Sequence, residues 1–265
     1  MNNNAFLHAE LYTNRASSIY HALQATVTRR LAHGLAVQAA YTWSHAIDNA
    51  SDPLVPSTGN QEFPRNSFDL AAERGNSDYD VRQRLALNYT WNLPVGRGHK
   101  YFSEGVLGKI LESWQFAGIT TFSKGLPFDV FTDLDTAHTG EIQRADLNPN
   151  GALVPVTNPR TQSGPNLGLF SDPPFGREGN LGRNRFTGSG INNWDIVLQK
   201  TFTISERADL EFRTEAYNVF NRVQLSQPDN RTSDLSSFGQ STSEVRRSDG
   251  TSGARQIQMG VKIRF

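Results

Sequence analysis

Residues 257–265 alternate between apolar side chains and polar or small ones up to the end of the chain. Successive side chains of an extended strand point to opposite faces, so the segment has one apolar face and one polar face. A helix would scatter both sets around its axis. The apolar face consists of Ile257, Met259, Val261, Ile263 and Phe265. The pattern therefore predicts a strand over residues 255–265 that ends on an aromatic side chain.

The same period of two recurs in six earlier segments, which predict six more strands. These strands cover residues 19–31, 35–45, 84–93, 114–122, 193–202 and 209–220. Residues 128–131 are expected to prolong the strand at 114–122, and Lys200 interrupts the apolar face of its own strand. Residues 105–113 instead have apolar side chains at helical spacing, which predicts one or two helical turns.

The connections along this series of strands are short, long, medium, long, short and long in turn, so the shorter ones alternate with the long ones. A tight turn joins the first two strands, and its Gly34 can adopt a positive φ without steric cost. Another short turn precedes residue 209. Long polar loops follow at 46–82, 132–192 and 221–253. Up-and-down transmembrane barrels have short periplasmic turns and long extracellular loops. The chain is therefore expected to end on the periplasmic side.

This arrangement predicts an all-β fold, an antiparallel up-and-down transmembrane β-barrel with an aromatic girdle at both membrane boundaries. Trp43 lies near the expected outer rim, and Trp114, Phe202 and Phe265 lie near the periplasmic rim. Bacterial single-chain barrels contain an even number of strands, about eight or more, whereas this pattern has seven. Open sheet edges in lipid leave backbone polar groups unpaired. We therefore expect further strands upstream and interpret residues 1–265 as a partial barrel.

Composition narrows the classes of protein. The 265 residues carry no net charge, which gives no indication of nucleic-acid binding, and they include no cysteine, which excludes disulfides and thiolate metal sites. Mean hydropathy is −0.52 and no apolar run approaches the roughly 20 residues of a membrane helix. The first six residues do not form a secretory signal, so a membrane-targeted chain would lack its beginning.

The charged residues of the last two strands suggest two interpretations. The lumen-facing set consists of Glu211, Arg213, Glu215, Lys262 and Arg264. These side chains either line a path for a solute or form cross-strand salt bridges on a water-facing wall, and we favour the salt bridges.

No motif in the chain indicates catalysis or a cofactor. Phosphate-binding, dinucleotide-binding and nucleophile-elbow motifs are missing, and the six histidines lack ligand spacing. Residues 146–151 imitate the opening of a calcium loop, but position 157 is Thr rather than Glu. We therefore expect no enzyme activity and no cofactor, and interpret residues 146–151 as part of a turn-rich loop.

Several segments resemble the late barrel of TonB-dependent outer-membrane receptors of the Oar-like type. The most specific is FRTEAYNVFN at residues 212–221. The others lie at residues 20–24, 41–48, 75–82, 114–118, 179–184, 238–239 and 255–258.

This resemblance implies roughly the last third of a receptor whose barrel of about 22 strands is preceded by a plug domain that couples to TonB. It also implies outer-membrane lipid and the barrel-assembly machinery as partners. Inner-membrane TonB would act only through the missing N-terminal segments, and the cargo would be an unidentified small molecule or glycan. The strand at 255–265 would be the assembly signal. The protein would be located in the outer membrane of a Gram-negative bacterium.

Two alternatives stay open at this point. A soluble β-sandwich or lectin-like binding module would also show alternating strands, although its turns come every 8 to 12 residues or so. An Oar-like barrel could also serve adhesion or secretion instead of uptake.

Overall fold

The computed structural model describes residues 13–51, 64–99, 101–156, 158–245 and 253–265. The prediction on the secretory signal concerns the first six residues, which lie outside the described residues. Position 157, which was compared with the last ligand of a calcium loop, also lies outside them, as do parts of the loops at 46–82 and 221–253. The elements in chain order are β1 (Ser18–Ala32), β2 (Leu35–Asp48), β3 (Gly75–Asn76), β4 (Gln83–Asn92), α1 (Gly105–Leu111), β5 (Trp114–Ser123), β6 (Pro127–Phe128), β7 (Asp146–Leu147), η1 (Leu167–Leu169), β8 (Phe170–Ser171), β9 (Phe186–Thr187), β10 (Ile191–Ser205), β11 (Ala208–Tyr217) and β12 (Gln256–Arg264).

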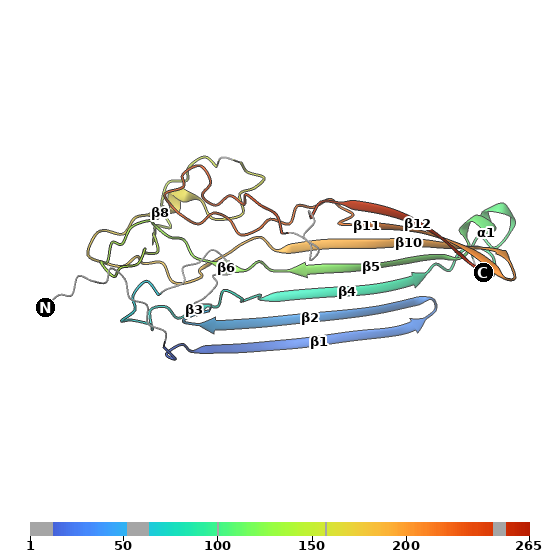
Figure 1. Ribbon diagram of the computed structural model, residues 1–265, viewed down its shortest axis with the longest axis horizontal. Coiled ribbons are helices and arrows are strands. Elements are labelled where there is room, and N and C mark those ends of the chain that lie inside the picture. Colours follow the sequence, from blue (N-terminus) through green and yellow to red (C-terminus); the bar gives the residue numbers. More distant parts are fainter. Residues whose placement is uncertain (1–12, 52–63, 100, 157, 246–252) are drawn as a thin grey trace.

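Seven long strands lie side by side in one antiparallel sheet (Figure 1). Their order is β1-β2-β4-β5-β10-β11-β12, with the short β3 paired to β2. Each predicted strand has a counterpart whose ends lie within three residues of the expected ones. The fold class predicted from the alternation, antiparallel and all-β, is confirmed. Neighbours in sequence are neighbours in the sheet, as an up-and-down connection requires.

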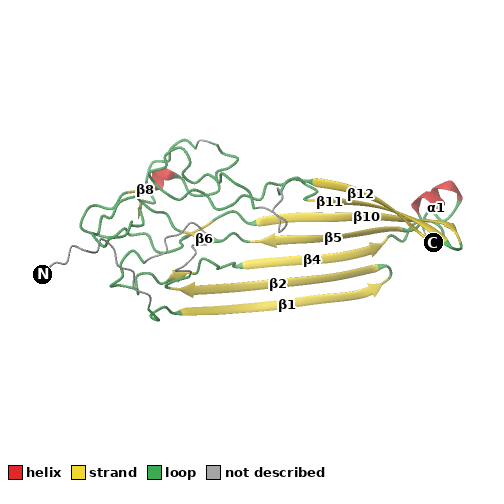
Figure 2. Cartoon of the chain, viewed as in Figure 1, coloured by secondary structure: helices red, strands yellow, loops and turns green. Residues whose placement is uncertain are grey.

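The long loops gather at one end of the sheet, and α1 and the C-terminus lie at the other (Figures 1 and 2). The seven long strands form one layer. The other two sheets among the described residues, β6-β9 and β7-β8, have two short strands each. This arrangement differs from the two large packed sheets of a β-sandwich. Among the described residues, no helix has the length and apolar character needed to cross a membrane.

The β1–β2 turn shows how local sequence sets the hairpin. His33 and Gly34 both have positive φ, 53° and 80°, which is the conformation of a type I′ turn. A Cβ on Gly34 would lie 2.7 Å from the carbonyl oxygen of Asn92 on the neighbouring strand. Glycine is therefore needed here both for its backbone conformation and for space.

Two predicted strand extensions are wrong. The strand expected at 209–220 ends at Tyr217, because Asn218 takes a positive φ of 47° and its side-chain oxygen accepts a 3.0 Å hydrogen bond from the Arg222 N–H. Residues 128–131 do not prolong β5 within the large sheet. Instead, Phe128 pairs with Phe186 in the separate sheet of β6 and β9.

The polar region at 132–192 is also more ordered than its composition indicates. It contains β7, η1, β8 and β9, and it contributes to the main hydrophobic cluster of the described residues. That cluster consists of Phe128, Val130, Ala145, Leu181 and Phe238, with Leu147, Leu167, Phe170 and Phe186 packed against it. The loops therefore fold into a packed cap, defined here as residues 64–82, 124–156, 158–190 and 221–245.

Candidate functional site

One face of the large sheet is apolar across all seven long strands. Register places Leu35 opposite Trp91, Trp91 opposite Phe116, and Phe116 opposite Leu198, all on this face. The face also stays open to the surroundings, since Val27 is 68% exposed and Met259 is 71% exposed. An exposed apolar surface of this extent is what the lipid-facing wall of a barrel presents.

The terminal strand continues this outward face to the last residue. Its five apolar side chains are all exposed, and four pair in register with β11, from Ile257 opposite Ala216 to Ile263 opposite Leu210. Phe265 follows the end of β12. Ile257, Met259, Val261, Ile263 and Phe265 are thus placed together on the outward face, and their role as an assembly signal stays a prediction.

The aromatic residues expected at the two rims lie near opposite ends of the sheet. Trp114 is the first residue of β5 and lies opposite Lys200 on β10. Phe202 lies two residues after Lys200 on β10, opposite Leu210 on β11. Trp43 lies toward the loop end of β2. This placement agrees with one aromatic girdle at each end of the sheet. That these side chains lie at the membrane boundaries stays a prediction.

The opposite face carries the charged set of the last two strands. Arg264 pairs with Glu211 across β11 and β12, and the Arg213 Nε lies 2.5 Å from a Glu215 carboxylate oxygen. Glu215 also accepts hydrogen bonds from the Tyr217 hydroxyl at 2.5 Å and the Gln258 amide at 2.6 Å. Lys262 lies opposite Glu211 in register. Four of the five charged side chains are therefore held in ion pairs, of which the Arg264–Glu211 pair joins two strands. The choice between a solute path and a salt-bridged wall stays a prediction.

Lys200 has a role that the sequence pattern did not reveal. It lies on the outward face of β10, yet it is only 2% exposed. Its Nζ donates to the backbone carbonyls of Ile110 at 2.8 Å and Glu112 at 2.6 Å, at the C-terminal end of α1. The ammonium also lies 4.7 Å from the centre of the Phe202 ring. A cation at a helix C-terminus satisfies carbonyls that lack intrahelical partners.

Buried ion pairs link the loops of the cap. Arg144 Nη1 donates to a Glu73 carboxylate oxygen at 3.2 Å, and its Nε donates to Asp129 at 2.9 Å. Arg65 Nε lies 3.2 Å from Glu73. Burial would lower the pKa of Arg144, but the two carboxylates raise it above its ordinary value, whereas burial raises the pKa of Asp129. The Arg144 guanidinium therefore faces the Glu73 and Asp129 carboxylates together and joins the segments that carry them.

A second polar cluster holds residues 179–184 against residues 75–82. The Asn184 side chain donates to the Asn76 carbonyl at 2.7 Å and to the Asp78 carboxylate at 2.6 Å. Arg183 forms ion pairs with Asp48 and Asp78. These two stretches are among those that carry the family resemblance, and the structure places them in contact.

The stretch resembling a calcium loop uses its first carboxylate for another contact. Arg177 binds both oxygens of Asp146, and the Asn180 N–H donates to Asp146 at 2.8 Å. Burial would raise the pKa of Asp146, but these hydrogen bonds and the Arg177 charge lower it below its ordinary value. Across the described residues no cluster of three or more potential metal-ligating side chains is found.

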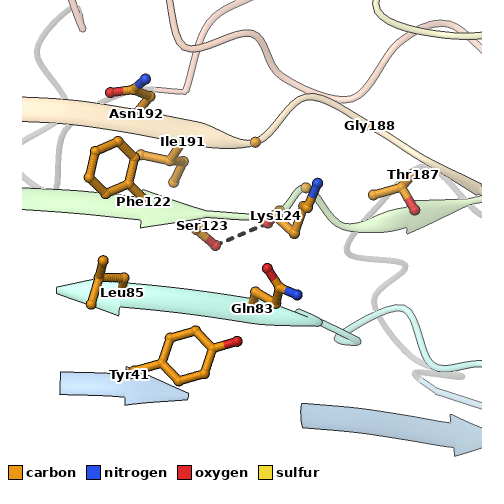
Figure 3. A pocket seen from close by; sticks show the side chains of 12 residues that line it. Tyr41, Gln83, Leu85, Phe122, Ser123, Lys124, Thr187, Gly188, Ile191 and Asn192 are labelled. Carbon is orange, nitrogen blue, oxygen red and sulfur yellow. Dashed lines mark hydrogen bonds between the residues drawn. The ribbon is translucent and has the colours of Figure 1, made fainter. Parts of the chain in front are cut away.

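A groove of about 650 Å³ opens near the loop end of the sheet (Figure 3). One row of cross-strand partners forms its wall, from Tyr41 to Leu85, Phe122 and Asn192. This row belongs to the apolar outward face, and Lys124 lies at the edge of the groove. The groove therefore opens on the outward face of the sheet rather than on the face that carries the charged residues.

A large sheet that is apolar on one face and polar on the other, with the shorter connections at one end and a loop cap at the other, defines a membrane-spanning β-barrel protein. The chain belongs to the family of the outer membrane beta barrel domain, which it matches over residues 2–258. It is therefore a protein of the outer membrane of a Gram-negative bacterium. No curated protein and no solved structure matches the chain.

Proposed function

We propose that the chain forms part of the barrel wall of a TonB-dependent outer-membrane receptor of the Oar-like type, which takes up a bulky solute. The observation that carries this proposal is the combination of an arc of seven long strands with a packed extracellular cap. Within the described residues, β1 and β12 each pair along one side only. Such edges in lipid require further strands to close the barrel.

The cap supports a receptor role because its loops are held in one arrangement. Buried ion pairs join Glu73, Asp129 and Arg144, which come from three different loop segments. Loops that are fixed by a scaffold are where binding residues commonly lie. The resemblance adds that such receptors take their cargo from outside, so the cap is the surface that the solute meets first.

The polar inner face supports passage or plug contact rather than chemistry. Four of its charged residues on β11 and β12 form ion pairs with one another, Arg213 with Glu215 and Arg264 with Glu211. We propose a wall without catalytic residues or a cofactor, with lipid and the assembly machinery as partners. Coupling to TonB would require the plug and the TonB-contacting segment that such receptors carry.

Growth experiments in the source bacterium test this function. A strain that lacks the gene and a strain that lacks TonB are grown on siderophores and on oligosaccharides too large for general porins. We expect both strains to lose growth on the same compound and to regain it when the missing gene is restored. Unchanged growth on every compound, together with lost surface attachment or lost secretion of a protein, would overturn the uptake proposal.

A further inference from the structure

We propose that α1 and the residues just before it form an interfacial anchor that inserts into the periplasmic leaflet of the outer membrane. The occupant of its apolar surface is phospholipid, at the boundary between headgroups and acyl chains. Membership of an outer-membrane family places lipid beside the sheet. The arguments below place the helix in that same lipid.

The segment exposes an unusual amount of apolar surface for a turn of this length. On α1, Val106 is 75% exposed, Leu107 is 62% exposed and Ile110 is 52% exposed. Just before the helix, Tyr101 and Phe102 are 56% and 60% exposed. Leaving such a cluster in water is unfavourable, because transfer of apolar surface from water to an apolar environment is favourable.

The helix is fixed to the sheet at its C-terminal end. Lys200 donates to the carbonyls of Ile110 and Glu112, and the Trp114 indole N–H donates to the Ile110 carbonyl at 3.0 Å. The Lys200 ammonium lies 5.5 Å from the Trp114 ring centre. A buried lysine on a lipid-facing strand is unfavourable unless its charge has partners, and the helix carbonyls provide them.

These contacts place the end of the helix on the outward side of the sheet. Lys200 lies in register with Trp114 on β5 and Phe212 on β11, both on the apolar face. The exposed apolar residues of α1 therefore continue the lipid-facing wall at the periplasmic rim. Figure 1 shows α1 at the end of the sheet where the chain terminates.

The connection around the helix is closely packed, so α1 has a defined position. The Gly96 N–H donates to the Tyr101 carbonyl at 2.9 Å, and the Arg97 N–H donates to the Gly108 carbonyl at 3.3 Å. Gly96 has a φ of 89°, and a Cβ there would lie 2.3 Å from the backbone nitrogen of Glu112. Amphipathic interfacial helices bury their apolar face about 5–10 Å into the boundary between headgroups and acyl chains.

Single-cysteine labelling tests the anchor directly, because the chain contains no cysteine of its own. The full gene product carries Leu107→Cys or Ile110→Cys, each labelled with an environment-sensitive fluorophore. It is refolded into phosphatidylethanolamine and phosphatidylglycerol vesicles. Arg207→Cys is the matched control, because it lies in the β10–β11 turn at the same end of the sheet and is exposed.

We expect labels at 107 and 110 to be quenched by nitroxide lipids, more by a nitroxide near the glycerol than by one near the chain end. The label at 207 should instead be quenched by iodide in the water. Equal iodide quenching at 107, 110 and 207 would overturn the proposal. Self-quenching that rises with protein density, without lipid quenching, would assign the surface to a second copy and would also overturn it.

Lys200→Met tests the attachment of the helix. In the Leu107→Cys background, this variant should lose the preference for the shallow nitroxide, because the helix is no longer held at the rim. An unchanged quenching pattern would contradict the role of Lys200. If the variant does not assemble, the labels at 107 and 110 in the otherwise unaltered protein still decide whether α1 contacts lipid, whatever solute the barrel transports.

Discussion

Arg144 and Glu73 form a buried ion pair between two loops, with their positions separated by 71 residues in the chain. Their side chains are 4% and 3% exposed. Asp129 completes the cluster from a third segment, at 2.9 Å from the Arg144 Nε. This cluster joins the loop after β2 to the two sides of the long loop after β5, so the arrangement of the cap depends on it.

Replacing Arg144 with Met should open the cap. The substitution keeps much of the volume but leaves the Glu73 and Asp129 carboxylates buried without their main partner. Losing one member of a buried pair costs about 3–5 kcal/mol. Local opening exposes the loops to proteases, so we expect faster cleavage within the cap, measured by limited proteolysis of the membrane-embedded protein.

Arg231→Met is the matched control for this prediction. Arg231 pairs with Asp133 in the same cap, but the two side chains are 44% and 42% exposed. Exposed pairs contribute about 1 kcal/mol or less. Cleavage of the control should stay near the wild-type rate, and equal acceleration in both variants would contradict a special role for the buried cluster.

The large sheet could be predicted from the sequence because its cause is local. Alternation of side chains fixes which residues share a face, and each strand's neighbour in the sheet is its neighbour in the chain. The strands from Ser18 to Arg264 therefore followed from period and turn signals. The pattern also located the helix at Gly105–Leu111.

The cap and Lys200 could not be predicted, because their contacts join distant segments. Phe128, Leu181 and Phe238 form one cluster, yet they come from three segments that lie more than 50 residues apart in the sequence. In the sequence, Lys200 only interrupts an apolar face. In the structure it donates to carbonyls at the end of a helix that lies about 90 residues earlier in the chain. Periodicity carries no information on such contacts. The sequence did contain one indication of the Lys200 contact, because a lysine at a lipid-facing position requires partners for its charge.

The Asp146–Arg177 pair should make part of the cap sensitive to strong acid. The folded pKa of Asp146 lies below its unfolded value of about 3.9, so the pair stabilises the cap fully above that value. The stabilisation is lost as the pH falls through the folded pKa. We expect hydrogen-exchange protection at residues 146–147 and 178–180 to be constant from neutral pH to about 5 and to fall below about 4.

Asp146→Asn provides the comparison for this pH dependence. The amide can still contact Arg177 but does not titrate, so protection in these segments should be weaker and independent of pH over the same range. The exchange rates are corrected for the intrinsic effect of pH on amide exchange. Identical acid profiles in the variant and the wild type would show that another group controls the transition.

Gly34→Ala should destabilise the β1–β2 hairpin. The alanine Cβ would face the Asn92 carbonyl at 2.7 Å in a left-handed backbone conformation, which by itself costs about 1–2 kcal/mol. Unfolding in urea, followed by the heat-dependent gel mobility of folded barrels, measures the loss. Gly260→Ala on β12 is the control, because a Cβ there meets nothing within 4 Å and should change stability little.

Phe265→Asp should reduce assembly into the outer membrane. Phe265 follows the outward face of β12 and is fully exposed, so its ring is free to contact lipid or, as we propose, the barrel-assembly machinery. A carboxylate there removes the aromatic group and adds a charge at the periplasmic rim. Lys262→Gln is the control on the polar face of the same strand. We expect the folded, membrane-extracted fraction to fall for Phe265→Asp and to stay near wild type for Lys262→Gln. Equal assembly of all three proteins would refute the assignment of the terminal aromatic residue to the assembly signal.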